Sequence, residues 1–185
     1  MGLSLWSGCN CRLITMTETV SQRTLIELLY GKGAHANPIA SVQGIPSDLA
    51  SRRLQGYPHS IFQILFHMNF WMEYELRRIR QEDPPYPSRA AESWPSDLSP
   101  VTDREWKQAE ARFVALIGEL SAFARSDPEF LNREVKATHA VHSQQSSSVL
   151  AVLWQTAVHN SYHIGQIVLL RRLLNSWPEQ VGDTW

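Results

Sequence analysis

Cysteine is scarce in this chain of 185 residues, which contains only Cys9 and Cys11. A disulfide across a single intervening residue is geometrically unfavourable, so a fold held together by disulfides is excluded. This cysteine usage is typical of a reducing compartment, and we expect a cytoplasmic location. The Cys9–Cys11 pair is either a metal-binding element or an inert part of a tail.

Long apolar runs and an excess of either charge are also lacking. No stretch reaches the length of about 20 apolar residues that a membrane-spanning helix needs. The first residues lack the basic and apolar regions of a signal peptide. Seventeen Lys and Arg residues are scattered among 18 Asp and Glu residues. The sequence therefore predicts neither a membrane nor a nucleic acid as a partner.

The length suits one domain with a sizeable core. We expect residues 17–185 to form that domain. Residues 1–16 are expected to be a disordered N-terminal extension, with Met16 as the true initiator.

Four stretches carry apolar residues at helical spacing, and we expect a long helix in each. They are residues 17–30, residues 60–81, a stretch from Thr102 or Asp103 to just before Asp127, and residues 147–174. Four long helices joined by long connections predict an all-α fold, a four-helix bundle with crossover connections.

The connections between these helices are expected to be mainly irregular. Residues 34–58 predict a structured loop with a short helix near 48–54, initiated by Ser47. Residues 84–100 are rich in proline and serine and predict a second long connection. Residues 129–146 are polar, with either a short strand or an extended loop at 135–141.

His159 and His163 are the most informative pair of residues. Residues four apart on a helix lie about one turn and roughly 40° apart, so both imidazoles can reach one point. This spacing is typical of helical metal ligands. The alternative is two neighbouring histidines with no shared ligand. The apolar flanks favour the metal, because two imidazoles facing a core need polar partners.

His67, in the middle of the second predicted helix, is the best candidate for a third ligand. Gln63 and Trp71 share its sector, which suggests a position facing a pocket. The alternative is a satisfied core histidine. His59 lies about 80° around the same helix and two turns away, so we expect it to cap the helix start instead.

The other histidines are weaker candidates. His35, in a predicted loop, could fold over the site. His139 and His142 lie in a polar segment and are expected at the surface.

Three neutral imidazoles leave a metal with an open position, as in catalytic rather than structural sites. Imidazole suits zinc, nickel, copper and iron. Gln166 is placed as a supporting partner or weak extra ligand. The helical sectors around the three histidines contain no carboxylate, which weakens a hydrolytic mechanism unless a loop residue such as Asp48 supplies the base. Tyr74 and Tyr162 are either hydrogen-bond donors to a ligand or packing residues.

Several motifs together carry a resemblance to a known family. They are GKGAHA at 31–36, PHSI at 58–61 with HMNFW at 67–71, HNSYHIGQIV at 159–168 with Leu170–Arg172, and the ending from Trp177 to Trp185. Over residues 17–185 the sequence resembles the DinB/YfiT-like superfamily of small metal-binding helical bundles. The second histidine motif is the most specific of these.

The resemblance implies a four-helix bundle with a nickel or zinc ion held by His67, His159 and His163. It also implies a homodimer and a small-molecule substrate, with a low-molecular-weight thiol such as mycothiol or bacillithiol as a candidate. Members include thiol-dependent isomerases and transferases, and many others have no established activity. The function that follows is a metal-dependent enzyme of the thiol transferase or hydrolase type. The alternatives are a non-catalytic, metal-binding stress-response module and a helical interaction protein, which would leave the histidine pair unexplained.

Overall fold

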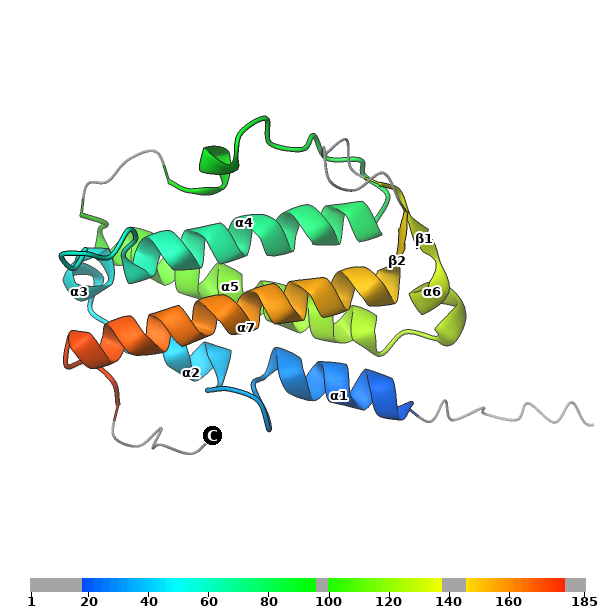
Figure 1. Ribbon diagram of the computed structural model, residues 1–185, viewed down its shortest axis with the longest axis horizontal. Helices are drawn as coiled ribbons and strands as arrows, with labels where there is room; N and C mark the ends of the chain where they lie inside the picture. The colour runs from blue at the N-terminus through cyan, green and yellow to red at the C-terminus, as the bar shows by residue number, and fades with distance from the viewer. Residues whose placement is uncertain (1–17, 96–99, 138–145, 179–185) are drawn as a thin grey trace, which may run out of the picture.

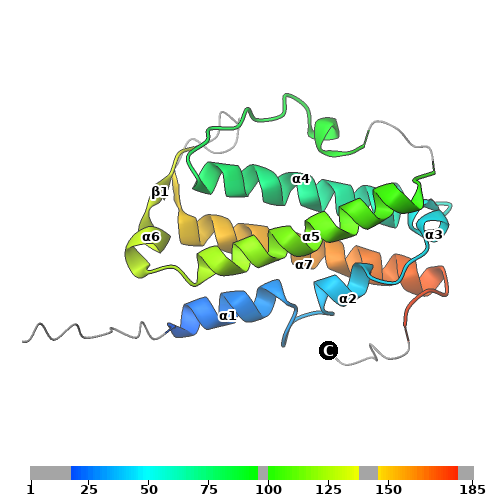
Figure 2. The same cartoon turned by 180° about the vertical axis from the view of Figure 1, so that it is seen from behind.

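Four long helices dominate the protein: α1 (Val20–Leu29), α4 (Ile61–Ile79), α5 (Asp103–Ala124) and α7 (Val149–Leu173). The computed structural model describes residues 18–95, 100–137 and 146–178. The four helices run alongside one another, and both α1 and α4 pack against α5 and α7 (Figures 1 and 2). The predicted all-α class is confirmed.

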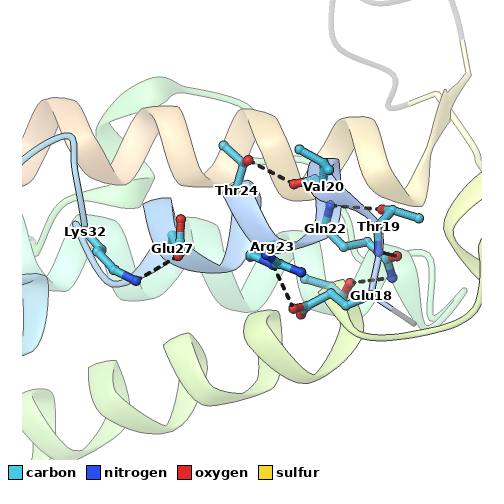
Figure 3. Close-up of polar contacts among 9 residues, drawn as sticks. Glu18, Thr19, Val20, Gln22, Arg23, Thr24, Glu27 and Lys32 are labelled. Atoms are coloured by element: carbon cyan, nitrogen blue, oxygen red, sulfur yellow. Dashed lines mark hydrogen bonds and ion pairs between the residues drawn. The ribbon is translucent and has the colours of Figure 1, made fainter. Parts of the chain in front are cut away.

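Helix α1 begins with a capping box. Thr19 Oγ1 accepts a hydrogen bond from the Gln22 amide, and the Gln22 side chain accepts one from the Thr19 amide (Figure 3). The Gln22 side-chain amide also donates to the carbonyls of Ala124 and Ser126. The first turn of α1 is therefore fixed to the C-terminal end of α5.

The other long helices begin in the same way. Ser60 and Gln63 form a capping box at the start of α4, and Thr102 and Glu105 form one at the start of α5. Ser148 caps α7 by accepting a hydrogen bond from the third amide of the helix. These caps satisfy amides that have no partner within the helix. They fix the residue at which α4 and α7 begin, and these two helices carry the three histidines.

The core lies between the long helices. Leu65 and Met68 from α4, Phe113 from α5, and Leu153 and Ile164 from α7 are fully buried. Within the described ranges, no helix is both long and apolar enough to cross a bilayer.

Two short helices occupy the predicted loop at 34–58. Helix α2 (Pro38–Val42) was not expected, and predicting a loop there was wrong. Asn37 caps it and Pro38 stands at its first position, a recognisable helix-start pattern. The predicted short helix exists as α3 (Ser47–Ser51), but its N-cap is Pro46. The Ser47 hydroxyl instead donates to Asp103.

The other two connections also contain short elements. The proline-rich connection holds a 3-10 turn, η1 (Ala90–Ser93). Helix α6 (Pro128–Asn132), capped by Asp127, falls where an irregular polar segment was predicted. β1 (Glu134–Val135) pairs antiparallel with β2 (Ser147–Ser148). The predicted extension at 1–16, with both cysteines, and His139 and His142 lie outside the described residues.

Candidate metal centre

The three predicted ligands lie together between α4 and α7. His67 and His163 are buried and His159 is half-buried. One ring nitrogen from each histidine lies within 4.8 Å of the others. His67 and His159 are 92 residues apart in the sequence, and the packing of α4 on α7 brings them into contact.

The separations of the ring nitrogens fit a shared cation. His159 Nε2 lies 3.3 Å from His67 Nε2 and 3.1 Å from His163 Nε2. Nitrogen ligands at the usual zinc–nitrogen distance are about 3.3 Å apart in a tetrahedral site and about 2.9 Å apart in an octahedral one. The observed values fall within this range.

Two of the imidazoles are held by partners on the outward side of the ring. His163 Nδ1 donates to Gln166 Oε1 at 2.7 Å, because an amide oxygen can only accept. His67 Nδ1 lies 3.0 Å from Ser93 Oγ, which can accept the proton in the same way. With the protons on Nδ1, the Nε2 lone pairs of both rings point inward. Converging lone pairs repel one another unless a cation or a proton lies between them.

Burial keeps these imidazoles neutral. The pKa of His67 is lowered to about 3, mainly by burial and to a smaller extent by the neighbouring imidazoles. Burial and His163 lower the pKa of His159 to about 4. Burial also lowers the pKa of His163, although the hydrogen bond to Gln166 opposes this shift. Neutral imidazole is the form that binds a metal, so the donors are ready at neutral pH.

The indole of Trp94 lies between two imidazoles. Its centroid is 4.0 Å from that of His67 and 3.6 Å from that of His59, with nearly parallel planes. His59 therefore packs on Trp94, and predicting it as the helix cap was wrong, since Ser60 takes that role. Ser93 and Trp94 together fix the His67 ring by one hydrogen bond and one stacked face.

Gln63 helps to cap the start of α4 and lines a cleft beside the histidine cluster. Its side chain completes the capping box with Ser60. It also lines an open cleft of about 690 Å³ together with His59, Phe66 and Trp94.

Trp71 begins a row of aromatic rings that leads away from the centre. Its ring lies 6.3 Å from that of His67 and 5.8 Å from that of Tyr86. Tyr86 and the buried Tyr74 line a cavity of about 310 Å³ at the C-terminal end of α4, together with Arg78. None of the three histidines lines this cavity, and the ring of Trp71 lies between it and His67.

Among the described residues, no carboxylate joins the histidine cluster. Asp48, the candidate loop base, is largely exposed and pairs with Arg52 at 3.8 Å. His35 donates from Nδ1 to the Ala36 carbonyl and does not belong to the cluster. Tyr162 is exposed, and its hydroxyl accepts from the Gln166 side chain.

Two residues of this site, Ser93 and Trp94, were not predicted from the sequence. They lie in an irregular connection, where no periodicity predicts the direction of a side chain. The available signal was a tryptophan in a proline- and serine-rich segment, because so large an apolar ring must be buried against something.

Fold and site together define an all-α protein with a buried three-imidazole cluster compatible with divalent metal binding. A family model described as DinB superfamily matches residues 34–167. The chain therefore belongs to the DinB superfamily, as its motifs predicted. Searches of curated proteins and of solved structures found no match.

Proposed function

We propose that this protein binds one divalent metal ion through the Nε2 atoms of His67, His159 and His163. The convergence of three neutral imidazoles on one point, two of them held by partners at their outer nitrogens, carries the proposal. A metal is the ligand that satisfies three inward lone pairs at once. Nickel and zinc are the proposed ions, because both accept imidazole ligands and tolerate the observed nitrogen separations.

The proposed activity is a metal-dependent transfer reaction on a small molecule, with a low-molecular-weight thiol as co-substrate. When bound at three imidazoles with an open position, a divalent ion acts as a Lewis acid. Water needs a far larger lowering of its pKa than a thiol, whose pKa is already about 8.5. A cluster without a carboxylate among the described residues therefore favours thiol chemistry over hydrolysis.

This chain's own residues would orient the ligands and provide room for the substrate. Ser93 and Gln166 hold two imidazoles by their outer nitrogens. Trp71, half-buried beside His67, leads to the cavity that Tyr74 and Tyr86 line. We propose that this cavity receives the organic part of the substrate.

A non-catalytic metal-binding module, of the kind that serves a stress response, is the second candidate. The same lack of a carboxylate base supports it, because a structural metal needs no base. In that role the metal would stabilise the contact between α4 and α7 without turnover.

Elemental analysis of protein purified without a histidine tag tests metal binding. We expect about one divalent ion per chain, lost in His159→Ala and retained in the control His59→Ala, whose ring lies outside the cluster. A wild-type protein without metal, or a metal content unchanged by His159→Ala, would contradict the proposal. A screen of thiol-transfer reactions on the loaded protein then separates the two candidates, since the module predicts stabilisation by metal without turnover.

A further inference from the structure

The open cleft of about 690 Å³ beside the histidine cluster has no part in the proposed reaction. Arg53 and the start of α4 form one side of it, and the connection that contains η1 forms the other. In Figures 1 and 2, η1 stands over α4. Trp94 belongs to the lining and also stacks on His67. The cleft therefore lies next to the proposed metal centre, with the indole ring between them.

The charges that line the cleft are mainly positive. Arg53 and Arg89 contribute two guanidinium groups, and Glu92 contributes a carboxylate. Arg89 lies 3.7 Å from Glu92, whereas Arg53 makes no ion pair with any residue that the structure describes. His59 adds no charge at neutral pH, because burial and, to a smaller extent, Arg53 lower its pKa. Two cations and one anion give the lining a formal charge of +1, which favours an anionic ligand.

Gln63 supplies a buried hydrogen-bond donor that the fold does not use. The residue is only 7% exposed, and its Oε1 accepts from the Ser60 amide in the capping box of α4. Its Nε2 group donates to no residue within the described ranges, although Gln63 lines the cleft. Buried amide groups nearly always have a hydrogen-bond partner. Because an NH2 group can only donate, the partner that fits here is an acceptor, such as the oxygen of an anion.

The start of α4 adds to the positive potential of the cleft. The aligned peptide dipoles of a helix act as about half a positive charge at its N-terminus. α4 is 19 residues long, and Pro58, His59 and Gln63 from its beginning line the cleft. An anion bound there would also be stabilised by this dipole.

The rest of the lining is apolar or aromatic. Phe66 is an apolar side chain and yet is 37% exposed, and Trp94 is half-buried. Pro58 and Pro95 extend this surface. An inorganic phosphate or sulfate would use the donors but not the apolar walls. A carboxylate on an apolar body uses both, and its single charge matches that of the lining.

We propose that this cleft binds an organic carboxylate, with the carboxylate group held by Arg53 and the Gln63 side-chain amide and the apolar body against Phe66 and Trp94. Guanidinium groups bind carboxylates through parallel, charge-assisted hydrogen bonds. The site is separate from the cavity assigned above to the substrate. The proposal holds whether or not the three histidines bind a metal.

A titration of the full chain with benzoate, followed by two-dimensional NMR of the side-chain amide groups, tests the proposal. We expect saturable binding with a dissociation constant of about 0.1–10 mM, as for other ligands of about nine non-hydrogen atoms. The Gln63 signal, identified by its loss in Gln63→Glu, should shift most. Benzamide has the same shape without the charge and should bind about tenfold more weakly or worse. Equal binding of benzamide, or no saturation by benzoate up to about 50 mM, would overturn the proposal. Tighter binding of phenyl phosphate than of benzoate would show that the carboxylate is the wrong class of ligand.

Gln63→Glu separates the site from the fold. Glutamate keeps the acceptor of the capping box, so the Tm should be unchanged or higher. In the cleft it replaces the donor with a carboxylate oxygen, so the dissociation constant for benzoate should rise about tenfold or more.

Arg53→Gln tests the second contact by itself. It should raise the dissociation constant for benzoate about three- to tenfold, since it removes a charge at the surface without disturbing α4. Arg104→Gln is the matched control, because Arg104 is an exposed arginine of α5 that likewise has no ion pair among the described residues. Its affinity for benzoate should equal that of the unaltered chain. Benzoate binding that is unchanged in both Gln63→Glu and Arg53→Gln would place the ligand elsewhere and overturn the proposal.

Discussion

Acid should destabilise the metal-free protein through its buried histidines. In the folded chain the pKa of His67 is about 3 and that of His159 about 4, against an ordinary value of 6.5. The folded state therefore binds fewer protons than the unfolded state at mildly acidic pH. The stabilising contribution is complete above pH 6.5 and is lost progressively as the pH falls towards the folded pKa values.

The size of the effect follows from those pKa values. At pH 5 an unfolded histidine is largely protonated while the folded one is not, which costs about 2 kcal/mol for each residue. Part of the shift of His67 comes from His159 and His163, so the two contributions overlap and about 3–4 kcal/mol is the expected total. A typical urea dependence of about 2 kcal/mol per molar converts this into a midpoint lowered by about 1.5–2 M between pH 8 and pH 5.

Urea unfolding in the presence of a chelator measures this effect. The control is the double variant His67→Gln/His159→Gln, which should lose most of the pH dependence whatever its stability at pH 8. Burial raises the pKa of Glu75, which adds stability as the pH falls and so has the opposite sign. Since Glu75 is present in both proteins, its effect cancels in the comparison. Equal pH dependence in the two proteins would refute the assignment of the acid sensitivity to the histidine cluster.

Three further predictions concern the ligands, the metal and a turn. Ser93→Ala and Gln166→Leu should each weaken metal binding by about 10–100-fold in a chelator competition, because each removes the partner of an outer imidazole nitrogen; unchanged affinities would show that these partners do not orient the ligands. Removing the metal should lower the Tm by about 5–10 °C in calorimetry, since an ion present at 100 times its Kd adds about 2.7 kcal/mol; an identical Tm with chelator would contradict metal binding to the folded state. Gly31→Ala should be less stable than the matched Gly33→Ala by about 2 kcal/mol in urea unfolding. Both glycines have φ near +77°, but only a Cβ at Gly31 would lie 2.5 Å from the Ala36 carbonyl oxygen, so equal losses would argue against this clash.

Local sequence patterns predicted the long helices well. Thr102 stands just before α5 and three residues before Glu105, and these two residues form the capping box that such spacing predicts. The start of α4 was predicted less well, because Ser60 caps it with Gln63 where His59 was expected to be the cap. The prediction failed for α2 and α6, which are too short for apolar periodicity to reveal, although Asn37–Pro38 and Asp127–Pro128 are recognisable start signals.

The sequence by itself determined that His159 and His163 share one face, because a spacing of four residues does this in any helix. The sequence also indicated His67 as the third ligand, because Gln63 and Trp71 lie on the same face of its helix. Only the tertiary structure decided that these residues meet, since the docking of α4 on α7 depends on side chains spread over both helices. The roles of Ser93 and Trp94 were likewise a tertiary outcome: a residue in an irregular connection has no periodicity, so only the folded chain determines which ring it contacts.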